Sequence, residues 1–359
     1  MSSKIKIGIV GIGRIGWPMA TGELKQYPDQ YEIVAACDLL EERIQRMEKE
    51  FGCKTYLDYA EMLKQSDIEL VYIATRSCDH YKHVMMALAA GKDVLVEKPA
   101  TISYEQALDM FAHANKKGTP RLFVHQQRRF EGPFNAIKNV IESGKLGKVY
   151  EVNIEENGFQ FRDDWQTISE FGGGQLLNWG PHIIDHSLQL LGTPTADVQS
   201  YVQQIVAGGD CEDHLRIRFV GDNNRVVNMC ISGSKALMQG RRIEAFGDRG
   251  AAVFSSEDDC TIKLRYINPA QEVPEVISDP GTPGGSFGTT GTYKSVFNPE
   301  WITEEKKIEF DEKLITFWEY LYDSLRNGAD FPVTEQDVLA IMRTISLVKA
   351  QNKKIMKMD

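Results

Sequence analysis

The stretch Ile5–Val10, IKIGIV, runs directly into Gly11–Gly16, GIGRIG, near the start of the chain. The short apolar run predicts a buried parallel strand, and the glycine spacing predicts a tight turn that opens a helix. Gly11 allows the turn, Gly13 lets the backbone approach a pyrophosphate, and Gly16 lets the helix pack against the strand. The helix N-terminus offers N–H groups to the phosphates. We therefore expect a bound dinucleotide, held by the whole turn: Gly11, Ile12, Gly13, Arg14, Ile15 and Gly16.

The residues that follow this turn support the same interpretation. A helix is expected over 14–26, and a second apolar strand over 32–37 ends at Asp38, 22 residues beyond Gly16. An acidic residue about 20 residues past the turn takes the ribose hydroxyls. Its carboxylate would repel the 2′-phosphate of NADP, and Leu39 and Leu40 supply no cation to attract it. We expect NAD rather than NADP, with Arg43 as the nearby residue that keeps NADP open.

Composition narrows the class of protein. A chain of 359 residues with 42% hydrophobic and 26% charged residues predicts a soluble globular protein of two domains. The net charge of −10 disfavours nucleic acid or an anionic membrane surface as the partner. We find neither a signal peptide nor an apolar run that could span a bilayer, so a cytoplasmic protein is expected. The six cysteines show no paired spacing, which indicates free thiols rather than disulfides or a metal cluster.

Strands and helices alternate as far as residue 127. Strands are expected at 68–73, 94–96 and 122–124, and helices at 41–51, 58–65, 79–90 and 103–117. This alternation predicts an α/β domain with a doubly wound parallel sheet, the Rossmann arrangement, over residues 1–127. Ligands of such sheets collect at the carboxyl ends of the strands, which here are residues 74–80, 97–99 and 125–129.

The pattern changes beyond residue 127. A helix at 133–143 precedes strand-like runs at 149–156, 198–206, 215–219, 225–231, 243–246 and 251–254, in which apolar and polar residues alternate. Alternation predicts an open, mostly antiparallel sheet, whose polar face is either solvated or a subunit contact. We therefore expect an α+β domain over 128–359. Residues 280–291 are rich in glycine and proline and predict a connection, a lid or an arm; helices are expected at 311–326 and 335–352, the second packing near the first domain.

Together these motifs resemble the Gfo/Idh/MocA family, named after glucose–fructose oxidoreductase and inositol dehydrogenase, over nearly the whole chain. The resemblance lies in the glycine turn, in Glu97-Lys98-Pro99, in Arg128-Arg129-Phe130, and in the triple glycine at 172–174 followed by Gly180-Pro-His-Ile-Ile-Asp185. It implies a Rossmann domain, an open-sheet substrate domain, NAD(P), and a sugar, a polyol or a derivative as substrate.

The resemblance also implies the site. Lys98 corresponds to the lysine between cofactor and substrate, and His182 to the catalytic histidine. Oxidation of a secondary alcohol needs a base for the hydroxyl proton while hydride leaves the same carbon, and neutral imidazole suits that role. Lys98 can stabilise the developing negative charge on the oxygen. The implied cofactor contacts beyond the turn are Asp38, Leu39, Ala74, Thr75, Arg76, His80, Glu97, Lys98 and Gln126, and the implied substrate contacts are Lys98, Arg128, Trp165, Asn178 and His182.

Departures from the family pattern leave other interpretations open. Asn178 stands where many relatives carry Asp, and an amide cannot accept a proton or raise the basicity of His182 through charge. Arg76-Ser77 and Trp165-Gln166 also differ from the usual residues, which predicts a locally rebuilt cofactor pocket. His182 could instead be a helix histidine satisfied by Asp185 or a backbone carbonyl.

Two further residue pairs have alternative interpretations. His182 and His186 share a helical face with Asp185 between them, but no further ligand of matching spacing is evident, so we expect no metal. Arg128 and Arg129 could indicate an anionic substrate such as a sugar acid or phosphate, although a structural or cofactor-side role is favoured for Arg129.

We therefore expect an NAD-dependent dehydrogenase or reductase acting on a hydroxyl of a carbohydrate or cyclic polyol, with Lys98, His182 and Asn178 in catalysis. One alternative is a redox-neutral reaction, an elimination, epimerisation or glycoside cleavage in which NAD takes up hydride transiently. Another is a regulator that binds NAD without turnover, which would need neither Lys98 nor His182. By analogy with the family, a homodimer or homotetramer is expected through the second sheet.

Overall fold

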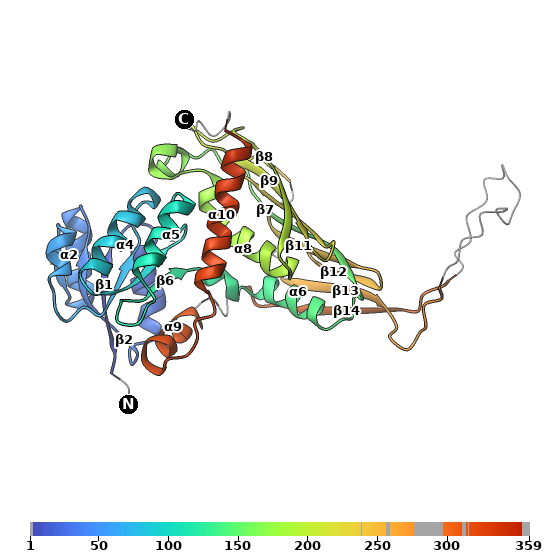
Figure 1. Cartoon of the computed structure of the whole chain (residues 1–359), viewed down its shortest axis with the longest axis horizontal. Helices are drawn as coiled ribbons and strands as arrows, with labels where there is room; N and C mark the ends of the chain where they lie inside the picture. The colour runs from blue at the N-terminus through green and yellow to red at the C-terminus, as the bar shows by residue number, and fades with distance from the viewer. Residues whose placement is uncertain are drawn as a thin grey trace, which may run out of the picture.

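The computed structural model describes residues 3–237, 239–255, 259–275, 297–310, 314 and 316–353. These residues form two β-sheets with helices packed on them and between them (Figure 1). The expected glycine-rich and proline-rich connection at 280–291 lies outside the described residues. No helix among the described residues has the length and apolar character needed to cross a membrane.

The first sheet has six parallel strands in the order β3-β2-β1-β4-β5-β6, which confirms the doubly wound arrangement. Sequence analysis missed β3, because three residues are too few to show a periodic pattern. The strands are β1 (Ile5–Val10), β2 (Tyr31–Cys37), β3 (Lys54–Tyr56), β4 (Leu70–Ile73), β5 (Asp93–Glu97) and β6 (Leu122–His125).

The helices of the first sheet lie close to the expected ranges. They are α1 (Gly16–Pro18), α2 (Glu41–Phe51), α3 (Tyr59–Leu63), α4 (His80–Ala89) and α5 (Tyr104–His113). The helix expected over 14–26 is irregular: α1 continues as a π-helix over Met19–Glu23 and a 3₁₀ turn over Leu24–Gln26. Single-turn π segments are rare and concentrate at functional sites, and this one lies beside the glycine turn.

The second sheet has eight strands in the order β14-β13-β12-β11-β7-β10-β9-β8. Only the β7–β10 pair is parallel, so the expected open and mostly antiparallel sheet is confirmed. The strands are β7 (Val149–Asn157), β8 (Thr195–Gln203), β9 (His214–Gly221), β10 (Val226–Ser232), β11 (Gly240–Gly247), β12 (Gly250–Phe254), β13 (Thr261–Ile267) and β14 (Trp301–Lys307).

Helices cover one face of the second sheet. Helix α6 (Gly132–Glu142) packs on β11 and β12, and α8 (Gly180–Leu191), preceded by the short α7 (Gln175–Asn178), packs on β7, β9 and β10 (Figure 1). The expected alternation is present, since Leu215, Ile217 and Phe219 are buried between exposed arginines. Sequence analysis missed β13 and β14. Strand β14 lies at the sheet edge and is largely exposed, so its sequence has no apolar face to detect.

The last two helices return to the first sheet. Helix α9 (Thr316–Asn327) inserts Phe317 and Trp318, both fully buried, into the core beneath β1 and β4. The Tyr31 hydroxyl donates a hydrogen bond to the Trp318 carbonyl at 2.5 Å, and the Trp318 indole donates to Glu23 at 2.7 Å. The first core is therefore completed by residues from the far end of the chain.

Helix α10 (Glu335–Gln351) lies between the two sheets, against α5 on one side and α8 on the other (Figure 1). Its buried stripe includes Val338, Ile345 and Val348. The Lys349 ammonium donates to the Ile102 carbonyl at 2.8 Å and so links α10 to the segment before α5.

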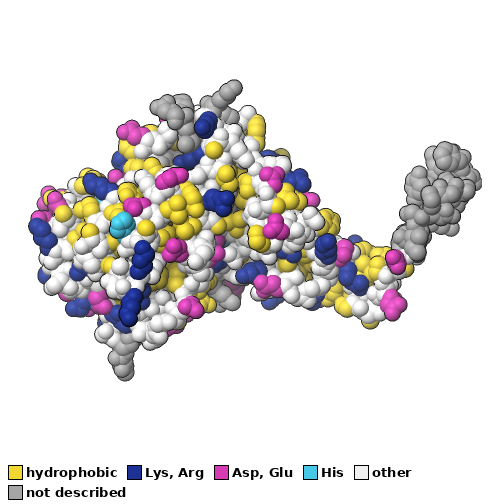
Figure 2. Space-filling view, in the orientation of Figure 1, with side chains coloured by type: hydrophobic (Ala, Val, Ile, Leu, Met, Phe, Trp, Pro, Cys, Tyr) yellow, Lys and Arg dark blue, Asp and Glu magenta, His cyan; other side chains and the backbone are white. Residues whose placement is uncertain are grey.

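Acidic and basic side chains are interspersed on the face of the molecule shown in Figure 2, with apolar groups scattered among them. The surplus of acidic residues in the chain is therefore not gathered into one patch on this face.

Candidate functional site

A cleft of about 370 Å³ lies between the carboxyl ends of the first sheet and the helices α7 and α8. It brings together residues from segments that are far apart in the sequence. Eleven of the residues expected at the site line it: Arg14, Ile15, Ala74, Thr75, His80, Glu97, Lys98, Arg128, Trp165, Asn178 and His182. The remaining expected residues lie outside the lining: Gly11, Ile12, Gly13, Gly16, Asp38, Leu39, Arg76 and Gln126.

The glycine turn leaves space that side chains would fill. Gly11 has φ +89°, and a Cβ there would lie 2.6 Å from the Ala74 carbonyl oxygen. A Cβ on Gly16 would lie 2.0 Å from the Gly11 oxygen, so both positions require glycine. At Gly13 the nearest atom to such a Cβ is the Arg43 Nη1 at 3.7 Å. The backbone at Gly13 is therefore open to close approach by a ligand, and a dinucleotide fits this turn.

Asp38 lies directly beside the turn and is 7% exposed. Its carboxylate accepts hydrogen bonds from the backbone N–H of Ile12 at 2.7 Å and of Leu40 at 3.0 Å. Arg43 forms an ion pair with it at 3.3 Å, whereas the Leu39 side chain is exposed. The acidic residue and a guanidinium therefore stand together at the end of β2.

Lys98 follows β5 and points toward α7. Its Nζ donates to the Asn178 carbonyl oxygen at 3.1 Å. Burial lowers the pKa of Lys98 to about 8, although neighbouring Glu97 acts in the opposite direction, and Arg128 and Arg14 lower it further. An amine with a pKa near 8 can both hold and release a proton close to neutral pH.

Glu97 is held behind Lys98 by two buried donors. Its Oε1 accepts from the Tyr72 hydroxyl and from His125 Nδ1, both at 2.6 Å, and its Oε2 accepts from the Lys98 backbone N–H at 3.2 Å. Burial opposes ionisation, but His125 and Lys98 bring the pKa of Glu97 below its usual value. Sequence reasoning placed His125 at a strand end but missed its bond to Glu97, and it missed Tyr72 because that residue looks like strand core.

His182 lies in the first turn of α8 and is 3% exposed. Its Nδ1 is buried and has no hydrogen-bond partner among the described residues. Burial, followed by the charges of Lys98 and Arg128, lowers the pKa of His182 well below its usual value. The imidazole is therefore neutral at physiological pH and retains an unused nitrogen.

Asn178 is connected to two arginines through Gln166. The Gln166 Nε2 donates to Asn178 Oδ1 at 3.4 Å, and Gln166 Oε1 accepts from both Arg14, at 2.5 Å, and Arg162. The same two guanidinium groups bind Asp164, at 3.1 and 2.7 Å. This network joins the glycine turn to the segment that covers the cleft, and sequence reasoning missed Arg162 and Asp164.

Arg128 stands over the Trp179 ring, 4.6 Å from its centroid, and pairs with Glu131 at 2.6 Å. Arg241 from β11 is fully buried, pairs with the same Glu131, and binds Glu156 at 2.6 Å. Nothing in the local sequence of β11 marks Arg241, because its partners come from distant segments.

Arg129 is bound by carboxylates of the protein itself. Its guanidinium binds Asp185 through two nitrogens and Asp337 at 3.3 Å, which joins the segment after β6 to α8 and α10. His186 Nε2 lies 2.7 Å from a backbone carbonyl oxygen. Asp185 and His186 thus have partners in the protein. The described residues contain no group of three or more His, Cys, Asp or Glu side chains that could hold a metal ion.

Three other expected cofactor contacts have partners of their own. Gln126 is buried, and its Nε2 donates to the Pro181 carbonyl at 2.6 Å, which anchors α8. The guanidinium of Arg76 lies over the Phe171 ring at 4.5 Å. Both ring nitrogens of His80 lie within hydrogen-bond distance of backbone carbonyls, and burial lowers its pKa.

A parallel sheet with an open glycine turn, facing a lysine, an amide and a neutral histidine, defines a dinucleotide-binding enzyme class. The chain matches the oxidoreductase family with an NAD-binding Rossmann fold over residues 5–126, and the GFO/IDH/MocA C-terminal domain over residues 134–253. The protein belongs to the Gfo/Idh/MocA family of oxidoreductases.

Relatives with named activities extend the comparison. The chain is 27% identical to scyllo-inositol 2-dehydrogenase (NADP(+)) of Bacillus subtilis, over 97% of this chain and 94% of the relative. It is 26% identical to myo-inositol 2-dehydrogenase of Thermotoga maritima, over 72% of this chain and 78% of the relative. An NAD-binding protein from Listeria innocua shares the fold, with a TM-score of 0.82, 23% identity and 98% of each chain covered.

Proposed function

We propose that this protein transfers hydride between a nicotinamide cofactor and a secondary hydroxyl or keto group of a sugar, a cyclic polyol or a derivative. One observation carries the proposal: Lys98, Asn178 and His182 line the same cleft as Arg14 and Ile15 of the glycine turn. Proton-handling groups and a dinucleotide site are thereby close enough to act on one substrate. The names of the two inositol dehydrogenase relatives point to the same substrate class.

NAD is the proposed cofactor in preference to NADP. Gly13 and the turn would hold the pyrophosphate, and Asp38 would take the ribose hydroxyls. The Asp38 carboxylate opposes a 2′-phosphate, but Arg43 beside it offers a cation, and the name of the Bacillus subtilis relative specifies NADP(+). Comparison of KM for NAD and NADP decides the choice, and a lower KM for NADP would reverse it.

The side chains divide the proton chemistry between them. Bound nicotinamide supplies the hydride acceptor. Neutral His182 takes the hydroxyl proton, and the Lys98 ammonium donates to the same oxygen and stabilises its developing charge. Asn178, Arg128 and Trp165 position the substrate. Because the pKa of His182 lies well below neutrality, His182 is available as an acceptor throughout the physiological range.

The first experiment is to record NADH absorbance when the protein meets inositols, aldoses, sugar acids and glycosides with NAD, and separately with NADP. A rise with one group of substrates establishes the dehydrogenase. No rise with any substrate, despite measured NAD binding, contradicts it. Product analysis of the same mixtures then separates a redox-neutral enzyme from a regulator.

Substitution of the lysine tests the catalytic assignment. Lys98→Ala is expected to leave NAD affinity within a few fold and to lower turnover by roughly 10³-fold or more, because one charged donor to a developing oxyanion is lost. Lys263→Ala, at an exposed position of β13, is the matched control. Unchanged turnover in Lys98→Ala would remove this residue from the mechanism.

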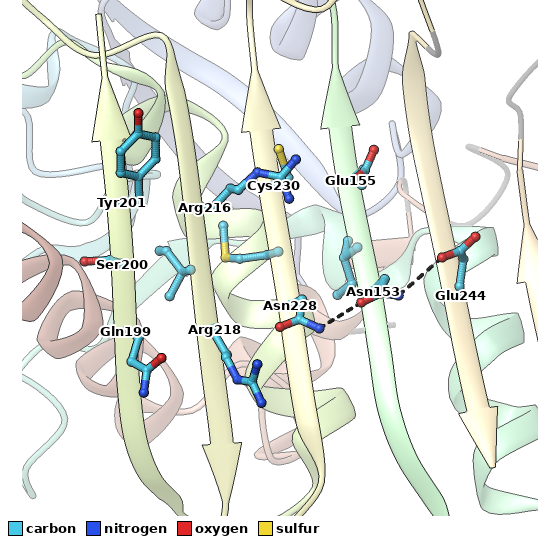
Figure 3. A pocket seen from close by; sticks show the side chains of 13 residues that line it. Asn153, Glu155, Gln199, Ser200, Tyr201, Arg216, Arg218, Asn228, Cys230 and Glu244 are labelled. Atoms are coloured by element: carbon cyan, nitrogen blue, oxygen red, sulfur yellow. Dashed lines mark hydrogen bonds between the residues drawn. The ribbon is translucent and has the colours of Figure 1, made fainter. Parts of the chain in front are cut away.

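We also propose that copies of the chain associate through the open face of the second sheet. This face carries a hollow of about 490 Å³ lined by polar side chains of five adjacent strands (Figure 3). Arg216 and Arg218 of β9 stand on the same face as Glu155 of β7 and Glu244 of β11, so the face carries both signs of charge. A face of mixed charge can complement itself across a two-fold axis.

A further inference from the structure

The cleft has a surplus of positive side chains. Among the described residues, its lining includes four cations and two carboxylates: Arg14, Lys98, Arg128 and Arg162 against Glu23 and Glu97. Since the whole chain has a net charge of −10, this concentration of cations is a local property of the site.

The carboxylates near these cations are either shared between two cations or already bound by other donors. Asp164 serves both Arg14 and Arg162. Glu97 is occupied by the buried donors Tyr72 and His125. The cations of the cleft therefore keep hydrogen-bonding capacity that the protein itself does not use.

Arg128 shares its carboxylate too. Glu131 accepts from Arg128 and also from the fully buried Arg241. The Arg128 guanidinium lies over the Trp179 ring; its side chain is 23% exposed and lines the cleft. A guanidinium that is stacked on an indole and only half neutralised is well placed to receive an anion.

Arg162 also has free hydrogen-bonding capacity. Its hydrogen bonds to Asp164 and Gln166 both use Nη2, and among the described residues Nη1 has no protein acceptor. Its side chain is 21% exposed and lines the cleft. The contacts from Arg162 through Gln166 to Asn178 lead to the carbonyl that receives the Lys98 ammonium.

We propose that the substrate carries an anionic group, a carboxylate or a phosphate, on its polyol, and that Arg162 binds this group with Arg128 as the second cation. The assignment rests on the proposed function and adds the substrate class to it. A planar guanidinium binds such oxyanions through two parallel hydrogen bonds, whereas a neutral hydroxyl in the same place would add no charge to balance two arginines that share one carboxylate, Asp164. Burial, and after it the charges of Lys98, Arg128 and Arg241, lower the pKa of His182.

Binding of small probes to the NADH-loaded protein tests this assignment without turnover. The probes are D-glucuronate, D-gluconate and D-glucose 6-phosphate, each compared with neutral D-glucose by titration calorimetry. At least one anion is expected to bind roughly tenfold or more tightly than glucose. The carboxylate and phosphate probes distinguish the two possible anions.

Two variants of Arg162 make the test specific. Arg162→Gln is expected to weaken binding of the favoured anion by about 10- to 100-fold, because a charge-assisted bidentate contact is lost. The affinity for glucose is expected to stay within about twofold of the wild-type value. Arg162→Lys keeps the charge but loses the planar guanidinium that can form two parallel hydrogen bonds. Its affinity for the anion is expected to lie between those of wild type and Arg162→Gln. Arg265→Gln, at an exposed position of β13 where the side chain lies over Trp301, is the control with the same change of charge.

Glucose affinity equal to that of every anion, or equal losses for anion and glucose in Arg162→Gln, would overturn the anionic substrate. So would failure of all three anions to bind. The dehydrogenase is tested separately: if the wild-type protein forms NADH from a neutral polyol with a kcat/KM at least equal to that for every anion, the enzyme is retained and the anion is rejected. No NADH from any compound rejects the enzyme, while the binding titrations still decide the anion.

Discussion

The charge of Lys98 depends on its neighbours, and this dependence can be measured. The ammonium form, which donates to the substrate oxygen, is present below its pKa of about 8. Turnover in the direction of oxidation is therefore expected to fall as the pH rises through this value. Glu97→Gln removes the carboxylate that holds the Lys98 pKa up, so the fall should move to lower pH by about one unit.

The measurement is kcat/KM against pH for both proteins with one substrate. Glu305→Gln, on the edge strand β14, is the control and should keep the wild-type profile. A profile that does not move in Glu97→Gln would assign the alkaline limb to a group other than Lys98.

At the scale of single residues, the sequence identifies residues that stand in local motifs. It does not identify the partners that reach them from distant segments. The Glu-Lys-Pro motif marks Lys98, and the strand-end rule marks its place in the sheet. Tyr72, which holds Glu97 from β4, and Arg241, which lies under the cleft from β11, sit in strands whose pattern indicates only burial. Their polar roles arise from contacts between segments and have no local signal.

Among the elements, α7 depends on a buried acid. Glu212, just before β9, is 5% exposed, and its carboxylate accepts the Leu176 N–H at 2.8 Å in the first turn of α7. Burial raises its pKa from 4.5 to about 7. A carboxyl whose folded-state pKa is raised stabilises the fold below its unfolded pKa, and this stability is lost as the pH rises through the folded value.

Glu212→Gln keeps an acceptor for Leu176 and removes the titration. It is expected to be more stable than wild type by about 1–3 kcal/mol at pH 8, and the difference should narrow to less than about 1 kcal/mol at pH 5. Urea denaturation at both pH values measures it, with exposed Glu170→Gln as control. A difference that is the same at pH 5 and pH 8 would contradict the buried titration.

The triple glycine before α7 shows what the sequence alone cannot explain about a structural element. Gly174 has φ +96°, and a Cβ there would lie 2.4 Å from Glu212 Oε1. The sequence shows that small residues are needed, but the carboxylate that makes them necessary lies 38 residues further along the chain. Strand β14 is the opposite case, because its charged sequence suits an exposed edge and resembles a loop.

At the scale of the whole molecule, association through the open face of the second sheet predicts that reversal of a charge on this face weakens the association. Arg218→Glu replaces a cation that lines the hollow by a carboxylate and so adds to the acidic charge of this face (Figure 3). Sedimentation velocity is expected to show a smaller assembly for this variant than for wild type, while Lys82→Glu, an exposed position on α4 of the first sheet, should behave as wild type. Identical sedimentation of all three proteins would place the contact on another surface.

The whole-chain pattern predicted both sheets, because the period of the apolar residues changes near residue 130. It predicted that the last helix packs near the first domain but did not identify the elements that the last two helices contact. The stripe of Val338, Ile341 and Ile345 indicates that α10 needs a covering surface, and only the structure shows that α5 and α8 both supply it.

The insertion of α9 into the first core has a consequence for synthesis on the ribosome. Residues 1–127 emerge nearly 200 residues before Phe317 and Trp318, which cover the apolar side of β1 and β4. The nascent first sheet therefore carries an unfinished surface for much of translation, a natural substrate for a chaperone. Truncation before α9 should expose Tyr31 and Tyr72 and yield an aggregating fragment, even though every strand of the dinucleotide-binding sheet would be present.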